Sequence, residues 1–474
     1  MTAIVWLRDD LRLDDRPAIR AAAAHPTLFV YVHDAAATRP LGGASRWWLD
    51  KSLAALAASL ESLGARLDIV AGAAEEVIPA LARHADAVFW TRRYGATGIE
   101  SDSRIKATLK HHGVRAESFN GQLLREPWTV KTEAGAPFKV FTPFWRRCRD
   151  MGPFEPPTPA PKRLLSAPWP QDAPRRAILA DLALHPSKPD WSAGLAKSWR
   201  PGEAGARARL QHFLEHGVAG YADGRDRLDG EATSRLSPHL RFGEISPRRI
   251  VAAVAAAGED GRGGDKFLSE IGWREFAYSL LFQAPELAVK NWSPRFDAFP
   301  WRQDEAALEA WRRGRTGYPV VDAGMRELWA TGYMHNRVRM IAASFLTKHL
   351  VLDWRLGEQW FWDTLCDADE ANNPASWQWV AGSGADAAPY FRVFNPILQG
   401  EKFDPEGRYV RRWVPELAGL DARYIHTPWK AGATRGYPSP IIDHDFARKR
   451  ALEAFAEIGP QRSPIAPNSA KKSG

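Results

Sequence analysis

Ala3-Ile4-Val5-Trp6-Leu7 is a run of five apolar residues near the start of the chain, and it decides the fold class. A short, uniformly apolar run is typical of a strand buried on both faces of a sheet. A helical pattern over residues 17–24 follows it, and a second apolar run covers residues 27–32. Because strands and helices alternate, we expect an α/β domain built on a parallel sheet.

The same alternation continues to about residue 130. An amphipathic helix is predicted over residues 45–63, and further strands over 66–70, 87–90 and 116–119. These elements predict a Rossmann-like parallel α/β domain over residues 1–130. Neither GxGxxG nor GxxxxGK[ST] follows the first strand, so the usual dinucleotide and P-loop phosphate sites are not indicated.

Two further regions follow the α/β domain. Residues 151–190 contain ten prolines and little periodicity, which indicates an extended segment; we expect a proline-rich interdomain connector over residues 131–198. From residue 199 onward helical patterns alternate with Gly/Pro turns. The sequence therefore predicts an all-helical domain over residues 199–474.

Composition narrows the class of protein. The chain has 474 residues, a formal net charge of +8 and 21 tryptophans, a several-fold excess of tryptophan that core filling alone does not explain. Two cysteines cannot form a disulfide framework or a four-cysteine metal site, so no metal is predicted. Since no apolar run is long enough to span a bilayer and the first ten residues lack a signal-peptide core, we expect a cytoplasmic protein.

Two segments of the helical region combine residue types that suit a ligand site. Thr233-Ser234-Arg235-Leu236-Ser237-Pro238 brings hydroxyls and an arginine to a predicted helix start, an arrangement suited to a pyrophosphate but also to an ordinary helix cap. Farther along, Glu270, Trp273 and Arg274 stand at i, i+3 and i+4 and so share one helical face. A carboxylate, an indole and a guanidinium on one face are poor core material, which favours function.

Two more segments point to the same pocket. Asn336 and Met340 are i, i+4 partners that could meet a heteroaromatic ligand, although Met340 is equally compatible with plain packing. Asp367 and Asp369 precede Asn373 and the tripeptide Trp377-Gln378-Trp379. A buried ionised carboxylate is costly without a fixed cation or hydrogen-bond donor. A polar cofactor beside Arg339 would give Asp367 and Asp369 such partners.

Taken together, these motifs resemble the DNA photolyase/cryptochrome family. The resemblance runs from about residue 3 to 450 and rests on the order of Trp6-Leu7-Arg8-Asp9-Asp10-Leu11-Arg12, Arg46-Trp47-Trp48-Leu49, Thr233 to Ser237, Trp273-Arg274-Glu275-Phe276, Gly317-Tyr318-Pro319-Val320-Val321-Asp322, Met334-His335-Asn336-Arg337 and Trp377-Gln378-Trp379. It implies a photolyase-type antenna domain, a long connector and a helical domain that binds FAD, with FADH⁻ as the active form. UV-damaged DNA is the implied partner, and we expect a monomer.

The resemblance also implies roles for individual residues. An ion pair is expected between Arg339 and Asp367, and Asn373 is expected near flavin N5. The implied FAD-binding residues are Tyr221, Thr233, Ser234, Arg235, Leu236, Ser237, Asn336, Arg339, Asp367, Asp369 and Asn373. The implied catalytic residues are Glu270 and an electron-transfer chain of Trp377, Trp354 and Trp301. The implied lesion and DNA contacts are Arg225, Glu270, Trp273, Arg274, Asn336, Arg337, Met340, Trp379 and Arg392.

Within the family, repair is favoured over light sensing. The lesion-lining set is complete, and only residues 459–474 follow the region of resemblance, where signalling cryptochromes often carry a long tail. A (6-4) photolyase would have a histidine at Asn336, so a cyclobutane pyrimidine dimer is the expected substrate and a cryptochrome-type sensor the alternative. The expected antenna is methenyltetrahydrofolate, with 8-hydroxy-deazaflavin second. Arg16, where the family usually has asparagine, and Asn372-Asn373-Pro374 depart from the family pattern.

Overall fold

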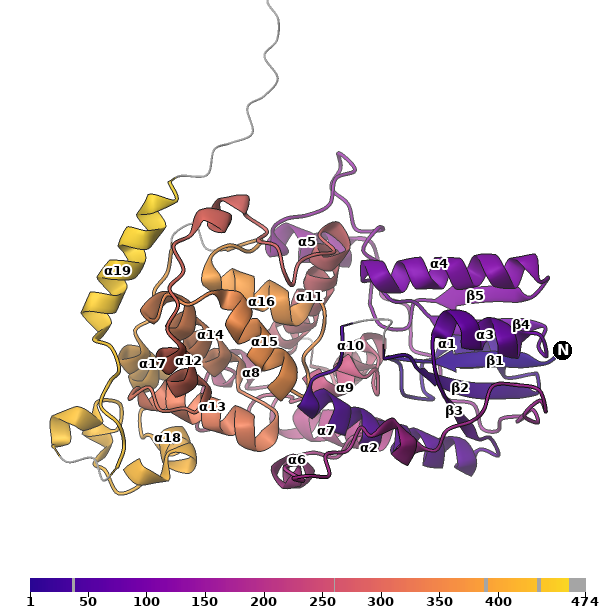
Figure 1. The fold of residues 1–474 in the computed structure, drawn as a ribbon, viewed down its shortest axis with the longest axis horizontal. Helices are drawn as coiled ribbons and strands as arrows, with labels where there is room; N and C mark the ends of the chain where they lie inside the picture. Colours follow the sequence, from indigo (N-terminus) through magenta and orange to yellow (C-terminus); the bar gives the residue numbers. More distant parts are fainter. Residues whose placement is uncertain (36–38, 260, 388–390, 433–435, 460–474) are drawn as a thin grey trace, which may run out of the picture.

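The computed structural model describes residues 1–35, 39–259, 261–387, 391–432 and 436–459. Figure 1 shows an α/β domain beside a larger helical region, with α19 (His444–Glu457) at the far end of the helical region. The predicted polar end, residues 459–474, lies outside the described residues except for Gly459.

The α/β domain contains one sheet of five parallel strands in the order β3-β2-β1-β4-β5. The strands are β1 (Ala3–Leu7), β2 (Thr27–His33), β3 (Leu67–Ala71), β4 (Ala87–Thr91) and β5 (Arg115–Phe119). Every predicted strand is present within one residue at each end, so the predicted parallel α/β class is confirmed.

Alternate residues of β1 face two different helix layers. Ala3, Val5 and Leu7 pack in one core with α1 (Pro17–Ala22) and α2 (Gly43–Ser62). Ile4 and Trp6 pack in the opposite core with α3 (Ala74–Ala82) and α4 (Ala96–His111). Since both faces of the sheet are covered, the uniformly apolar run at residues 3–7 is explained.

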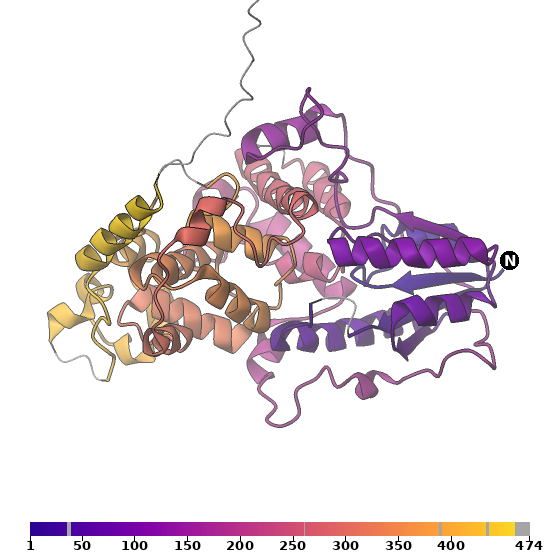
Figure 2. The same cartoon turned by 45° about the horizontal axis from the view of Figure 1, so that its top comes forward.

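The predicted connector is partly a helix. α5 (Phe141–Asp150) lies within residues 131–198 and packs on α11 (Arg262–Gln283), where Trp145 lies against Gly272 so closely that a Cβ there would be 2.6 Å from the indole. α5 therefore packs on the helical domain although it lies within the predicted connector. The proline-rich part follows, and it crosses the edge of the sheet through bridges at Ser166 and Ala177 (Figure 2).

The helical domain agrees with the prediction, since no strand occurs after residue 199 among the described residues. A short helix, α6 (Ala193–Ser198), ends the connector. The principal helices of the helical domain besides α11 and α19 are α7 (Glu203–His216), α8 (Tyr221–Gly224), α9 (Ser237–Arg241), α10 (Pro247–Ala256), α12 (Glu305–Arg312), α13 (Pro319–Thr331), α14 (Asn336–Ser344), α15 (Trp354–Thr364), α16 (Asn372–Ala381), α17 (Pro396–Phe403) and α18 (Arg408–Trp413). A π-helical turn over Phe345–His349 continues α14.

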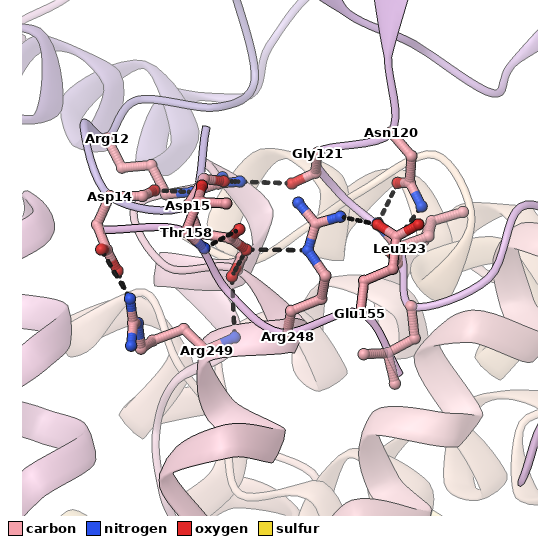
Figure 3. A network of polar contacts seen from close by, with 12 residues as sticks. Arg12, Asp14, Asp15, Asn120, Gly121, Leu123, Glu155, Thr158, Arg248 and Arg249 are labelled. Carbon is pink, nitrogen blue, oxygen red and sulfur yellow. Dashed lines mark hydrogen bonds and ion pairs between the residues drawn. The ribbon is translucent and has the colours of Figure 1, made fainter. Parts of the chain in front are cut away.

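Buried charges join the two domains around the loop after β1 (Figure 3). Arg12 donates hydrogen bonds to the backbone carbonyls of Gly121 and Gly243, at 2.6 and 2.8 Å. Asp14 forms a two-bond ion pair with Arg249, and Asp15 accepts from Arg248, both from α10. Because these groups are held by specific partners, the orientation of the helical domain on the sheet is fixed.

The same loop contains Arg16, the arginine that stands where the family usually has asparagine. Arg16 forms an ion pair with Asp10 at 2.8 Å, and both side chains are fully buried. Asp10 also accepts from the Thr91 hydroxyl at 2.5 Å. The arginine therefore neutralises a carboxylate that is inaccessible to water.

We expect Arg16→Ala to lower the free energy of unfolding by about 3–5 kcal/mol, because it leaves the Asp10 carboxylate buried without its cation. Urea unfolding measures the loss. Arg20→Ala on the exposed side of α1 is the matched control, with an expected change within about 0.5 kcal/mol. Equal effects of the two changes would contradict a structural role for the pair.

Candidate functional site

A cavity of about 320 Å³ opens in the helical domain, lined by residues of α8, α9, α11, α14, α16 and the loops beside them. All eleven predicted cofactor-binding residues line it: Tyr221, Thr233, Ser234, Arg235, Leu236, Ser237, Asn336, Arg339, Asp367, Asp369 and Asn373. Segments that are up to about 150 residues apart in the sequence thus meet in one place.

The predicted ion pair between Arg339 and Asp367 is present. The guanidinium donates two hydrogen bonds to the carboxylate, at 3.0 and 2.7 Å, and the Ser237 hydroxyl donates a third at 2.5 Å. Burial acts to lower the pKa of Arg339, but the charge and hydrogen bonds of Asp367, together with smaller effects of Tyr333 and Glu327, raise the pKa above its ordinary value. Asp369 serves as a cap, because it accepts the backbone N–H groups of Ala371 and Asn372 where α16 begins.

Arg235 provides a test of whether the cavity suits a dinucleotide cofactor. Its backbone has φ of +52°, in the left-handed region, and its guanidinium lies between the rings of Trp199 and Tyr333, at 4.5 and 5.0 Å. Its buried Nε has no hydrogen-bond partner within the described part of the chain. A strained backbone and an unpartnered cationic nitrogen, beside the hydroxyls of Thr233 and Ser237, suit an anionic group such as a pyrophosphate.

Asn373 is oriented by a residue that the sequence did not single out. Its side-chain N–H group donates to the backbone carbonyl and the carboxylate of Glu358, at 3.0 and 2.8 Å. Glu358 in turn forms a two-bond ion pair with Arg39 of the α/β domain. The amide therefore leaves its carbonyl oxygen for a ligand, which agrees with the expected contact to flavin N5. A buried glutamate in a tryptophan-rich helix was the available signal.

Several of the predicted lesion and DNA contacts pair with neighbouring side chains. Glu270 forms ion pairs with Arg225 and Lys266, and Asn336 lies against the Met340 sulfur at 3.9 Å. Arg337 pairs with Asp226 at 2.7 Å, an acid that sequence reasoning missed. Each of the three cations therefore has an acidic partner in this structure.

Not every predicted contact lies in this cavity. Trp273 lines it, whereas Trp379 and Arg392 line a separate cavity of about 50 Å³, and Arg337 lines neither. Arg274 lines the main cavity, but it is 8% exposed and donates to the Gln122 carbonyl at 2.7 Å. Its guanidinium is thus held by a backbone carbonyl in this structure, and its DNA contact stays a prediction.

The three predicted electron-transfer tryptophans extend from the cavity toward the surface. Trp377 lines the cavity and lies over Gly357 of α15, where a Cβ would be 2.1 Å from its ring. Trp354, at the start of α15, is fully buried and donates to Asn291. A backbone bridge between Arg302 and Leu352 brings Trp301, which is partly exposed, to the same region.

His335, next to Asn336, is a buried histidine whose Nδ1 accepts the Arg337 backbone N–H and caps α14. Burial lowers its pKa to about 4, so it is neutral at pH 7. Between pH 6.5 and 4 the unfolded chain gains a proton that the folded chain does not, and the free energy of unfolding falls as the pH drops. The expected contribution is about 3 kcal/mol.

We therefore expect His335→Asn, which keeps an acceptor for the cap, to unfold with a shallower pH dependence than the parent chain between pH 6.5 and 4. Urea unfolding at four pH values across this range measures it. Parallel curves for the two proteins would show that His335 does not remain neutral in the folded state.

Comparison with known proteins agrees with this geometry. The family description "DNA photolyase" matches residues 3–162, and "FAD binding domain of DNA photolyase" matches residues 267–457. A deoxyribodipyrimidine photo-lyase of Agrobacterium fabrum is 52% identical and covers 96% of this chain and 98% of its own length. The chain belongs to the DNA photolyase family.

Photolyases and cryptochromes both occur among the relatives. The crystal structure of a class III photolyase from Agrobacterium tumefaciens matches this chain with a TM-score of 0.92 and 50% sequence identity. The match covers 96% of this chain and 97% of the other chain. Cryptochrome-1 of Arabidopsis thaliana is 39% identical over 96% of this chain and 70% of its own length. These matches confirm the predicted family, the fold and the photo-lyase enzyme class, and they confirm a FAD-binding domain.

No helix in the described residues has the length and apolar character that crossing a membrane requires.

Proposed function

We propose that this photolyase repairs cyclobutane pyrimidine dimers in DNA by light-driven electron transfer. The observation that carries the proposal is the single cavity that joins all the expected FAD contacts to Glu270, Trp273, Asn336 and Met340 at its entrance. A carboxylate, an amide, an indole and a thioether suit a neutral, partly apolar pair of fused pyrimidines.

The substrate must leave the duplex to enter the cavity. A dimer is already weakly stacked and paired, which lowers the cost of flipping it out. Trp273 and Trp379 are each half-buried, and we assign to them the surfaces that replace the lost stacking. Arg225, Arg337 and Arg392 contact the phosphates in this proposal, and they make the affinity fall as salt rises.

FAD, held in reduced form as FADH⁻ along Thr233–Ser237 and Asp367–Asn373, would lend one electron to the dimer on photoexcitation and recover it once the cyclobutane bonds have split. Arg339 and Asp367 hold a fixed, neutralised pair beside that position. The Asn373 carbonyl oxygen, oriented through Glu358, is available to accept a hydrogen bond. Glu270, whose carboxylate pairs with Arg225 and Lys266, would accept a hydrogen bond from a pyrimidine ring N–H and so hold the dimer where the charged site stabilises its radical anion.

The cryptochrome-type sensor is the alternative, and the 39% identity to Cryptochrome-1 keeps it under consideration. The two functions predict different affinities for damaged DNA. A repair enzyme binds UV-irradiated DNA more tightly than undamaged DNA, and equal affinity for both would favour the sensor. Filter-binding or fluorescence anisotropy at fixed salt measures the ratio.

Trp379→Ala is expected to weaken binding to dimer-containing DNA by about tenfold to a hundredfold, because one base–aromatic stack is worth about 1–3 kcal/mol. The flavin content should not change, since Trp379 does not line the main cavity. Trp329→Ala, at a 66% exposed tryptophan on α13, is the matched control and should leave lesion binding unchanged. Loss of affinity in both variants would contradict the assignment.

We place the antenna chromophore in a second cavity, of about 260 Å³, at the carboxyl ends of β1 and β2. Arg93, Tyr94 and Gln122 line it together with Arg39 and Arg46. Cations at this entrance suit the carboxylates of a folate tail, which favours methenyltetrahydrofolate over 8-hydroxy-deazaflavin. Mass spectrometry of the chromophore released on denaturation distinguishes the two.

We further propose that the enzyme acts in the cytoplasm as a monomer. Both cysteines, Cys148 and Cys366, are free and buried, which agrees with a reducing compartment. Light scattering of the purified protein tests the monomer.

A further inference from the structure

Asp386 connects the two tryptophans that we assign to the lesion. Its backbone carbonyl accepts the indole N–H of Trp379 at 3.0 Å. Its side chain accepts the backbone N–H of Phe141 at 3.2 Å. The Phe141 ring stacks on Trp273, with centroids 3.9 Å apart and planes 11° apart. One residue therefore contacts Trp379 directly and Trp273 through a single intermediate.

The identity of residue 386 suits this role. Its φ is +54°, a left-handed conformation that aspartate and asparagine adopt more readily than most residues. Phe141 is the first residue of α5, so its N–H has no partner within the helix, and a carboxylate there meets the positive end of the helix dipole. Aspartate thus provides both the backbone geometry and the acceptor.

The segment before Asp386 is tied to α16. The backbone N–H groups of Gly382 and Gly384 both donate to the Gln378 carbonyl at 2.9 Å, and Ser383 accepts the Ser293 N–H at 2.8 Å. Gln378 is fully buried, and its side chain donates to the carbonyls of Leu287 and Lys290. These hydrogen bonds anchor the segment that leads to Asp386 on the end of α16, so the helix determines where Asp386 lies.

We propose that Asp386 is a positioning residue that fixes the spacing between Trp273 and Trp379. The two indoles belong to different helices, α11 and α16, so neither helix alone determines how far apart they stand. A flipped pyrimidine dimer binds between the two indoles most tightly if their spacing is fixed before binding, because ordering them afterwards costs affinity. The inference rests on the proposed repair function, and it concerns selection of the lesion rather than cofactor binding.

The test compares Asp386→Ala with Asp386→Asn in the full-length, flavin-containing protein. Affinities are measured for the same oligonucleotide with and without one thymine dimer. We expect Asp386→Ala to lower the damaged-to-undamaged affinity ratio about tenfold. Asp386→Asn, which keeps the left-handed conformation and an acceptor oxygen, should retain most of it. Flavin content and flavin photoreduction should match the parent in both variants.

Two controls separate positioning from general destabilisation. Asp443 accepts the Phe446 N–H where α19 begins, so Asp443→Ala removes an equivalent cap on a helix that carries neither tryptophan and should keep the ratio. Phe141→Leu removes the stack on Trp273, and its effect should not add to that of Asp386→Ala, since both act through one link.

An unchanged ratio in Asp386→Ala, or equal losses in the alanine and asparagine variants, would overturn the inference. Failure of the proposed function is a separate result, because the parent protein would then show no preference for damaged DNA.

Discussion

Trp377→Phe should nearly abolish light-driven reduction of the bound flavin while leaving repair by chemically pre-reduced enzyme largely intact. Trp377 is the tryptophan of the proposed chain that lines the main cavity, and it is 2% exposed. Phenylalanine keeps an apolar ring in this core but is much harder to oxidise than an indole, so the first transfer step is lost. The protein's part in this chemistry is to position the donor.

The measurement follows flavin absorbance under blue light with an external reductant, and then repair after reduction in the dark with dithionite. Trp301→Phe, at the partly exposed end, should slow photoreduction without altering repair by pre-reduced enzyme. Trp47→Phe is the matched control, because Trp47 is equally buried but lies in the α/β domain. Normal photoreduction in Trp377→Phe would contradict the proposed chain.

Asp367→Ala is expected to remove most of the bound flavin and to lower the free energy of unfolding by about 3–5 kcal/mol. The change leaves the Arg339 guanidinium without the carboxylate that accepts two of its hydrogen bonds. It also frees the Ser237 hydroxyl at the start of α9. The ratio of flavin to protein absorbance reports the cofactor, and urea unfolding reports stability.

A double variant separates these two effects. Asp367→Leu with Arg339→Met replaces the ion pair with apolar side chains of similar volume, which often restores stability. We expect stability to return toward that of the parent while flavin binding stays low, since the polar contacts are absent. Full flavin content in the double variant would show that the pair serves folding alone.

The fold was predictable from sequence because its signals are local. The apolar run at residues 3–7 and the alternation that follows depend on neighbouring residues, and all five strands lie where the pattern predicts them. α5 was missed because a short amphipathic helix directly before a proline-rich stretch resembles part of a connector, and its packing of Trp145 on Gly272 of α11 is a contact between distant residues.

The sequence predicted which residues line the candidate site, but not which residues orient them. The motifs at residues 233–237 and 367–373 line one cavity, but the residues that orient them were not found. Glu358 reaches Arg39 across 319 positions, and Asp386 reaches Phe141 across 245. No spacing rule relates such pairs, because they arise from how the domains pack. The Gln122 carbonyl that accepts from Arg274 lies 152 positions away and likewise follows from no sequence spacing.

The tripeptide Trp377-Gln378-Trp379 carries three separate roles. Trp377 lines the main cavity, Gln378 donates to the carbonyls of Leu287 and Lys290, and Trp379 donates to the Asp386 carbonyl. Successive residues of a helix point about 100° apart, so one short motif can serve two sites and the scaffold between them.

Splitting of a defined thymine dimer tests the central claim most directly. Reduced enzyme is incubated with an oligonucleotide that contains one dimer, under blue light or in the dark, and the restored thymines are separated by chromatography. We expect repair in the light, none in the dark, and none in the light with the Asp367→Ala variant. An undiminished dimer after illumination of flavin-loaded, reduced enzyme would contradict the assignment and favour a light sensor.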